Sequence, residues 1–281
     1  MLQFTVNAKL CTRCGLCAAD CPARIIVQEG KNLPSILPEK EAECLQCQHC
    51  LAICPTAAIS ILGRNPDNSL PLSSDSFPRL DQMTRFVRGR RSVRQYKDEN
   101  VDPALITTLL ATLANVPTGV NKRDLTFTVI DDKAVMHQLR EQVLAALTAA
   151  GQANRIPERC QYLLEAPPAY YAHKVDIIFR GAPHALVVSA PSDAPCPGED
   201  VTLALAYFDL LAQSARLGTV WWGILKMCLE VLPDLKLLFG LPPRQRYYYG
   251  MLFGIPAIRY PRAVQRDDAA IVKRLPMPQK T

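Results

Sequence analysis

Residues 11–22 read Cys-Thr-Arg-Cys-Gly-Leu-Cys-Ala-Ala-Asp-Cys-Pro, and the same cysteine spacing returns at residues 44–55 as Cys-Leu-Gln-Cys-Gln-His-Cys-Leu-Ala-Ile-Cys-Pro. The two runs lie 33 positions apart, and a short apolar stretch follows each of them, at 25–27 and 59–62. Self-similarity at a fixed period indicates a repeated structural unit. The sequence therefore predicts a duplicated small domain over residues 1–62.

Each run has the form Cys-x2-Cys-x2-Cys-x3-Cys-Pro, which matches the bacterial ferredoxin pattern for [4Fe–4S] clusters. The first three cysteines of a run bind one cluster, and the fourth binds the other cluster. The predicted ligand sets are Cys11, Cys14, Cys17 and Cys54, and Cys44, Cys47, Cys50 and Cys21. Zinc is the alternative, but its four ligands would leave cysteines over in each run. His49, between two ligands, either tunes a cluster potential or is an exposed loop histidine.

Composition and charge limit the classes of protein to consider. The chain has 281 residues, 49% of them hydrophobic, which is enough for one large core and a smaller one. Residues 1–10 do not resemble a secretory signal, so we expect the eleven cysteines to be reduced in a soluble, cytoplasmic protein. No apolar run approaches the roughly 18 residues that cross a bilayer. Residues 1–62 hold five Lys/Arg and five Asp/Glu, so the net charge of +6 comes entirely from the remainder, with 27 against 21.

The composition changes between residues 63 and 80, where Asn, Asp and Ser are punctuated by one glycine and three prolines. Such a stretch, with little apolar periodicity, is typical of a linker. We therefore expect a small domain over 1–62, a linker over 63–80 and a second domain over 81–281.

The second domain mixes helix and strand patterns. The helix predicted over residues 102–115 begins with an aspartate N-cap followed by proline. Residues 125–130 alternate and are rich in strand-forming side chains, which predicts a strand. Asp131 or Asp132 then caps a long helix that runs towards residue 150.

A further helix is predicted from apolar residues at steps of four and three, which are Val201, Leu205, Phe208, Ala212 and Ala215. Gly218 is expected at the C′ position of this helix. An apolar stripe of this kind is most often intrachain core. With strands predicted at 185–190 and 247–253, the fold class is α+β: a duplicated βαβ-type cluster domain, then an α/β layered domain with a central sheet flanked by helices.

Five arginines crowd into ten residues, at Arg85, Arg88, Arg90, Arg91 and Arg94. A single cluster of arginines around Ser92 is suited to binding one phosphate group through bidentate hydrogen bonds. A solvated charged surface is one alternative. A nucleic-acid face is another, although such a face normally interleaves aromatic residues or recurs as a stripe elsewhere.

Four segments of the second domain resemble the nitroreductase family of FMN-dependent oxidoreductases. Residues 90–94 (Arg-Arg-Ser-Val-Arg) are similar to the family's phosphate-binding start, and residues 116–121 (Val-Pro-Thr-Gly-Val-Asn) to the loop whose asparagine bonds the flavin ring. Residues 217–223 (Leu-Gly-Thr-Val-Trp-Trp-Gly) look like the segment beside the isoalloxazine. Residues 253–256 resemble the terminal Gly-Tyr-Pro stretch, with Ile255 in place of the tyrosine.

The resemblance covers about residues 81–281, and four motifs in the family's order are together specific. It implies a nitroreductase-like fold, bound FMN and a homodimer with FMN at the subunit interface. The apolar stripe of residues 201–215 is then either part of that interface or intrachain core. The FMN-binding residues that it implies are Arg90, Arg91, Ser92, Arg94, Pro117, Thr118, Gly119, Asn121, Trp222, Gly223 and Arg266. Arg259 and Arg262 compete with Arg266, and the family's usual Asn-x-Gln-Pro is here replaced by Asn-Lys-Arg-Asp from Asn121 onward.

An N-terminal 2[4Fe–4S] ferredoxin domain joined to a flavin domain converts one-electron into two-electron chemistry. We expect an external donor such as a ferredoxin, two [4Fe–4S] clusters, FMN, and a small organic acceptor such as a nitroaromatic, quinone, enone or halogenated phenol. Trp221, Trp222 and Tyr247–Tyr249 either line the acceptor pocket or pack in the core. The alternative function is an electron-transfer or redox-sensing protein without small-molecule turnover. Nucleic acid and membrane partners are not expected, and no side chain is assigned as a catalytic acid.

Overall fold

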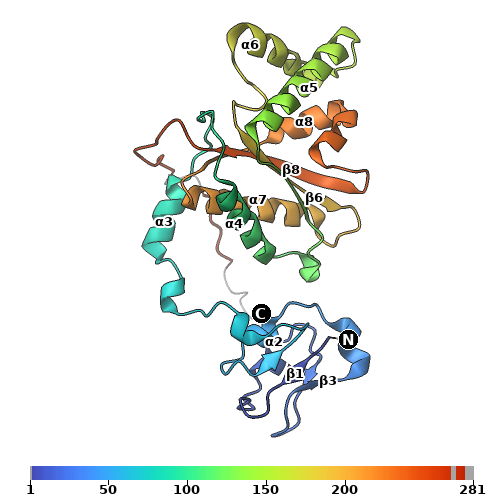
Figure 1. Ribbon diagram of the computed structural model, residues 1–281, viewed down its shortest axis with the longest axis vertical. Coiled ribbons are helices and arrows are strands. Elements are labelled where there is room, and N and C mark those ends of the chain that lie inside the picture. Colours follow the sequence, from blue (N-terminus) through green and yellow to red (C-terminus); the bar gives the residue numbers. More distant parts are fainter. Residues whose placement is uncertain (1, 267–269, 276–281) are drawn as a thin grey trace, which may run out of the picture.

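The computed structural model describes residues 2–266 and 270–275, and it has two parts of unequal size (Figure 1). The smaller part is N-terminal, and the larger part contains a sheet with helices on both faces. The eleven cysteines are all free, so no disulfide contributes to the fold. None of the helices in the described ranges has the length and apolar character needed to cross a membrane.

Short elements make up the small part: β1 (Thr5–Val6), α1 (Leu16–Ala19), β2 (Ile26–Val27), β3 (Ser35–Ile36), the 3-10 helix η1 (Pro38–Glu43), α2 (His49–Ala52) and β4 (Ile59–Ser60). β1 pairs with β4, and β2 pairs with β3, both in antiparallel fashion. The core between them includes the buried side chains of Leu2, Ile25, Ile26, Leu51 and Ile59. So small a core gives only marginal stability by itself, and metal or disulfide cross-links commonly reinforce natural domains of this size.

An exposed connection joins the two parts. It contains the 3-10 helices η2 (Pro66–Asn68) and η3 (Ser74–Ser76) and the helix α3 (Leu80–Gly89), which has no buried residue. Leu70 is 82% exposed and Leu80 is 83% exposed. Figure 1 shows this connection running along one side of the molecule. The sequence did not predict α3, and the predicted domain boundaries stay a prediction.

A four-stranded sheet lies at the centre of the larger part, formed by β5 (Thr126–Ile130), β6 (His184–Pro191), β7 (Gly218–Trp221) and β8 (Gln245–Gly254). The strand order is β5-β6-β8-β7, and all neighbouring strands are antiparallel. All eight residues of β6 are buried, as expected for a strand covered on both faces. The start of β7 lies beside the end of β8, since Gly218 pairs with Gly254.

Helices cover both faces of this sheet (Figure 1). α4 (Pro103–Thr112) and α7 (Pro197–Ser214) lie on one face, and α5 (Lys133–Gln152), α6 (Ala166–His173) and α8 (Gly223–Val231) lie on the other. Side chains alternate along β6, so Leu186 and Val188 pack with α7, whereas Val187 packs with α5 and α8. The remaining 3-10 helices are η4 (Leu113–Asn115), η5 (Gly119–Asn121), η6 (Glu158–Glu165) and η7 (Pro233–Phe239). The predicted layered fold class is confirmed.

The structure decides two alternatives that the sequence left open. Asp132 rather than Asp131 caps α5, because its carboxylate accepts a hydrogen bond from the Ala134 amide at 2.6 Å. The apolar stripe of α7 is intrachain core, since Val201, Leu205, Phe208 and Ala212 are buried against the sheet. A subunit interface on α7 would therefore have to use its other side.

The prediction that Gly218 occupies the C′ position of α7 is wrong. The helix ends at Ser214, and Arg216 takes the left-handed conformation with φ of 64°. Gly218 is instead the first residue of β7. A Cβ atom at Gly218 would lie 2.7 Å from Cγ1 of Val93, so close strand packing rather than helix termination requires a glycine here.

Candidate cofactor sites

The small part contains two cavities, each lined by four cysteines. One is lined by Cys21, Cys44, Cys47 and Cys50, and the other by Cys11, Cys14, Cys17 and Cys54. The structure thus brings together the same two sets that the cysteine spacing indicates, with the fourth cysteine of each run crossing to the other cavity. No group of three His, Cys, Asp or Glu side chains in the described ranges is arranged to bind a single ion. The thiols surround a cavity rather than a point, which suits an iron–sulfur cluster better than zinc.

Local backbone geometry positions these cysteines. Gly15 and Gln48 take left-handed conformations, with φ of 76° and 61°, and directly precede the short helices α1 and α2. Backbone amides point at sulfur, since Ala58 N lies 3.2 Å from Cys54 Sγ. Burial raises the pKa of Cys50 to about 11. Burial by itself would raise the pKa of Cys54 as well. Hydrogen bonds from the backbone amides of the following turn outweigh this effect and lower the pKa of that thiol.

The position of His49 favours the simpler of its two interpretations. Its Nδ1 atom lies 3.2 Å from Asp20 Oδ2, and its side chain is 58% exposed. His49 is therefore an exposed histidine at the start of α2.

Three of the four motifs that resemble the nitroreductase family meet in the larger part. The arginine segment lies along β7, since the Val93 amide donates to the Thr219 carbonyl at 2.8 Å. The residues after β8 lie along the same segment, since the Lys97 amide donates to the Ile255 carbonyl at 2.9 Å. Residues 90–94, 218–223 and 253–256 are therefore neighbours in space.

The buried carboxylate of Asp209 organises the arginine segment. Asp209 lies on α7, is 3% exposed, and accepts hydrogen bonds from Thr219 and Gln213. Arg90 Nη1 lies 3.5 Å from Asp209 Oδ2, so the charge of Arg90 is largely balanced within the protein. Asp209 is not among the residues predicted from the sequence, although an aspartate inside a largely apolar helix was a signal for it.

Arg91 and Arg94 provide the cationic groups that remain for an anion. The buried Nε atom of Arg91 has no hydrogen-bond partner among the described residues. Arg94 lies next along the segment and is exposed, with one Nη1 contact of 3.3 Å to the Ser92 carbonyl. A buried unpaired donor beside a second guanidinium and a hydroxyl fits a phosphate group.

The fourth motif, residues 116–121, lies elsewhere. The Gly119 amide donates to Asp200 Oδ1 at 2.9 Å near the start of α7. Asp200 and Asp209 are nine residues apart on this helix, which corresponds to about 14 Å. Within one chain, therefore, the loop lies well away from the arginine segment. Gly119 has no room for a side chain, because a Cβ atom there would lie 2.8 Å from Cys196 Sγ.

The same loop contacts the small part. The Asn121 side-chain amide donates to the Leu45 carbonyl at 2.7 Å. A cleft of about 610 Å³ opens around this contact, lined on one side by residues 45–52 and on the other by residues 114–123. Cys47, one of the predicted cluster ligands, lies in its wall.

Two other predicted FMN-binding residues have unexpected environments. The Trp222 side chain is 1% exposed, packs against Phe179 and Phe239, and donates from its indole nitrogen to the Ile178 carbonyl. Only the backbone of Trp222 is left for a ligand. Arg266 is exposed, and no contact between it and the arginine segment is seen in the described ranges.

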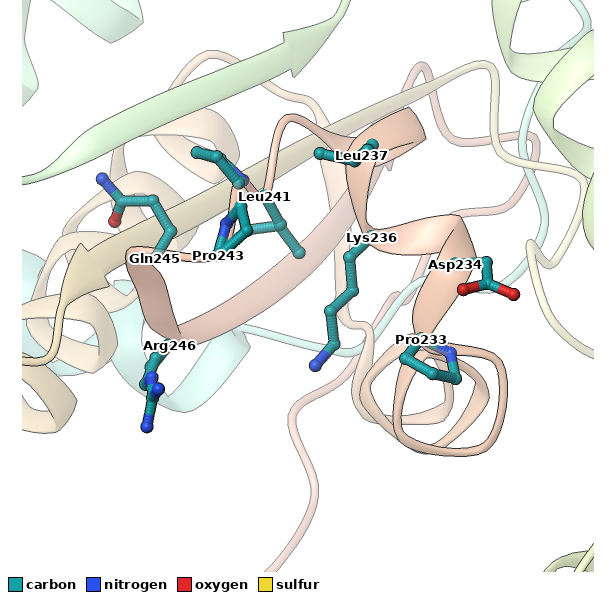
Figure 2. A pocket seen from close by; sticks show the side chains of 9 residues that line it. Pro233, Asp234, Lys236, Leu237, Leu241, Pro243, Gln245 and Arg246 are labelled. Atoms are coloured by element: carbon teal, nitrogen blue, oxygen red, sulfur yellow. The ribbon is translucent and has the colours of Figure 1, made fainter.

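Two hollows lie near the start of β8. The first, of about 580 Å³, is formed by the segment 233–246, where Figure 2 shows the Lys236 and Arg246 side chains pointing to the same side. The second, of about 440 Å³, shares these two cations and adds the three tyrosines Tyr247–Tyr249. The first hollow is at the opposite end of β8 from the arginine segment, about 30 Å along the strand. The second reaches Tyr249, whose hydroxyl would lie 2.6 Å from a Cβ atom at Gly223.

Comparison with solved structures identifies the fold of the larger part. An FMN-bound nitroreductase from Bacteroides fragilis matches with a TM-score of 0.54 and 21% identity, over 68% of this chain and 99% of that one. An FMN-bound nitroreductase from Desulfitobacterium hafniense matches with a TM-score of 0.52 and 18% identity, over 68% and 97% of the two chains. The larger part therefore has the nitroreductase fold.

Family models match both parts. The model described as "Nitroreductase family" matches residues 87–255, and the chain belongs to that family of oxidoreductase enzymes. The model described as "4Fe-4S dicluster domain" matches residues 10–59. A curated relative from Methanothermobacter thermautotrophicus, with a name of the NADH dehydrogenase/NAD(P)H nitroreductase type, is 24% identical over 175 residues, which is 61% of this chain and 75% of that protein.

Proposed function

We propose that this chain is an iron–sulfur flavoenzyme that takes electrons from a one-electron donor protein, such as a ferredoxin, through two [4Fe–4S] clusters to FMN, and reduces a small organic acceptor. The observation that carries the proposal is the cleft in which the wall of a four-cysteine cavity faces the 116–121 loop. Passing single electrons to a flavin that reduces its acceptor by two electrons needs an iron–sulfur cluster close to the flavin, and a cluster in this cavity would lie beside the 116–121 loop. FMN, when bound, exchanges electrons singly or in pairs.

Particular residues would hold the cofactors. Each four-cysteine cavity would bind one [4Fe–4S] cluster through its thiolates. Arg91, Ser92 and Arg94 would bind the FMN phosphate, with the unpaired Nε atom of Arg91 as one donor. Arg90 would contribute through its pairing with Asp209, and Arg266 stays a predicted partner. The backbone at Trp222 and Gly223 would border the flavin ring.

The separation of the 116–121 loop from the arginine segment supports a homodimer. Pro117, Thr118, Gly119 and Asn121 would contact the FMN whose phosphate is held by the partner subunit. Exposed apolar side chains are available for such an interface, since Leu203 on α7 is 40% exposed and Tyr207 is 45% exposed. These two lie on the side of α7 away from its buried stripe.

The tyrosine-lined hollow is the proposed acceptor site. Tyr249 packs on Trp221 with ring centroids 5.7 Å apart, and Lys236 Nζ lies 5.6 Å from the centroid of the Tyr248 ring. Aromatic rings and cations would bind a flat acceptor carrying electron-withdrawing oxygen or halogen atoms by stacking and by charge. Nitroaromatics, quinones, enones and halogenated phenols are the acceptor classes to test.

Anaerobic purification with cofactor analysis tests the proposal. We expect about eight irons, as many sulfides and one FMN per chain. Arg91→Ala should lose FMN, whereas Arg85→Ala should retain it, because Arg85 pairs with Asp81 on the exposed helix α3. Zinc in place of iron, or no flavin in the wild-type protein, would contradict the proposal.

Turnover separates an enzyme from an electron relay. With reduced ferredoxin as donor, the loaded protein should convert at least one compound of an acceptor panel to a reduced product. Electron passage to a partner protein, with no product from any acceptor, would favour the relay or sensor function instead. The same assay with NADH or NADPH shows which donor is used, and assay of cell fractions checks the predicted cytoplasmic location.

A further inference from the structure

The two four-cysteine cavities differ in where they face. The cleft between the two parts has Cys47 in its wall and is lined also by Leu45, Gln48 and His49, all from the second cysteine run. The cavity that contains Cys47 shares these residues with the cleft, whereas the cavity that contains Cys14 shares no lining residue with it. Only one of the cavities therefore adjoins the 116–121 loop.

We propose, on the basis of the function given above, that electrons leave the small part from the cluster held by Cys21, Cys44, Cys47 and Cys50, and that they enter through the cluster held by Cys11, Cys14, Cys17 and Cys54. We call these two the outlet cluster and the inlet cluster, and we call residues 116–121 the flavin loop. Asn121 is the positioning residue that holds the outlet cluster against the flavin loop. Each donor molecule would lose one electron to the cluster held by Cys11, Cys14, Cys17 and Cys54. Two such electrons, with two protons from water, would reduce one acceptor by two electrons.

The geometry of Asn121 supports this positioning role. Its side-chain amide bonds the Leu45 carbonyl, one residue after the ligand Cys44. Asn121 and Val120 both take left-handed conformations, with φ of 55° and 46°. Consecutive left-handed residues other than glycine are uncommon and are retained where the surroundings fix them.

The surrounding contacts do fix this loop. Gly119 is tied to the buried carboxylate of Asp200, which is 4% exposed. The Arg123 amide donates to Thr118 Oγ1 at 2.9 Å. The Asn121 amide group is thus presented to the small part from a rigid base.

The inlet cavity has the exposure that a docking donor requires. Cys14 is exposed, whereas Cys17 and Cys50 are buried. The neighbouring Leu10 is 47% exposed and Leu16 is 42% exposed. Electron transfer slows steeply with distance, so a donor that docks here would reduce the nearer cluster first.

Serine substitutions at one ligand of each set test the order of transfer. The holoenzyme is mixed with reduced ferredoxin in an anaerobic stopped-flow spectrometer, and cluster and flavin bleaching are followed separately. We expect Cys47→Ser to leave rapid bleaching of the inlet cluster but to abolish rapid flavin bleaching. With ferredoxin as donor, Cys14→Ser should abolish rapid bleaching of the inlet cluster and of the flavin. Dithionite should still bleach the outlet cluster and the flavin in this variant. The reversed pattern would overturn the order, whereas a wild-type flavin that is never reduced would overturn the proposed function instead.

A second pair of variants tests Asn121 without relying on turnover or on cluster loss. Asn121→Gly keeps the left-handed backbone but removes the amide, and we expect hydrogen exchange to increase at residues 45–49 and not at 11–17. Flavin bleaching per bound FMN should slow by about tenfold, since small misplacements of reacting groups have effects of this size or larger.

Asn115→Ala is the matched control, because Asn115 lines the same cleft but donates to Thr112 of its own chain segment. It should change neither measurement. Unchanged exchange at 45–49 in Asn121→Gly would contradict the positioning role.

Discussion

At the scale of single residues, the contact between Gly218 and Val93 determines whether the arginine segment can lie along β7. An added Cβ atom at Gly218 would lie within 2.9 Å of three side-chain atoms of Val93. Real Cβ atoms do not approach other atoms so closely, so the strand and the segment would have to separate. The segment's hydrogen bond to Thr219 would then be strained.

We therefore predict that Gly218→Ala lowers the stability of the larger part by about 1–3 kcal/mol and weakens FMN retention. Unfolding in urea and the FMN content of the purified protein measure the two effects. Adding Val93→Ala should restore part of both, because it removes Cγ1 and Cγ2, two of the three atoms that collide, and keeps Cβ. Equal losses in the single and double variants would show that this contact is not the cause.

At the scale of elements, β6 is linked to the start of α4 through a buried histidine. His184 is 0% exposed, and its Nε2 atom accepts a hydrogen bond from the Val101 amide at 2.9 Å. Burial lowers the pKa of His184, so the folded protein holds this ring in its neutral form. The stability from the neutral ring is present above the unfolded-state pKa of about 6.5 and is lost as the pH falls below it.

We predict that the difference in unfolding free energy between wild type and His184→Gln shrinks as the pH falls from 7.5 to 5.5. Below pH 6.5 the difference should fall by up to about 1.4 kcal/mol per pH unit, because glutamine can accept the same hydrogen bond but does not titrate. Urea unfolding across this range measures the difference. A difference that is independent of pH would mean that His184 binds its proton equally in both states.

Some helices and strands could be predicted from the sequence and others could not. The elements at 103–112, 126–130, 133–152 and 184–191 follow from caps and periodicity, which are local properties. α3 was not predicted, although Leu80, Met83, Phe86 and Val87 recur at helical spacing, and none of these side chains is buried in the structure. β7 is only four residues long, and its place beside β8 depends on non-local pairing.

The residues of the candidate sites also fall into two groups, those that could be predicted from local spacing and those that could not. The cysteine sets could be predicted because cluster ligation fixes their spacing in the chain. The roles of Asp209 and Asp200 could not, because each carboxylate contacts residues far away in sequence, at Arg90 and Gly119. The bond from Asn121 to Leu45 spans 76 positions and depends on how the two parts meet.

At the scale of the whole molecule, the two parts differ in how their folds are stabilised. The larger part has two extensive cores, whereas the small part buries few apolar side chains. Metal-binding free energy contributes directly to folding in such small domains. The stability of residues 1–62 should therefore depend on the iron.

We predict that removing iron with an anaerobic chelator unfolds residues 1–62 and leaves the sheet of the larger part intact. Hydrogen exchange followed by mass spectrometry measures both regions in one experiment. The control is the same chelator already saturated with ferrous iron, which has no free site to take iron from the protein. Unchanged protection of residues 1–62 after complete iron loss would contradict the prediction.

The exposed connection between the two parts also has a kinetic consequence. Under the proposed function it would keep the small part near the 116–121 loop, so the two would meet at an effective concentration set by the tether, in the millimolar range for short flexible links. The Asn121 contact with the Leu45 carbonyl would then need only to orient the two parts and not to hold them together. Dilution of the protein would slow the encounter with the external donor, but the internal transfer would keep its rate.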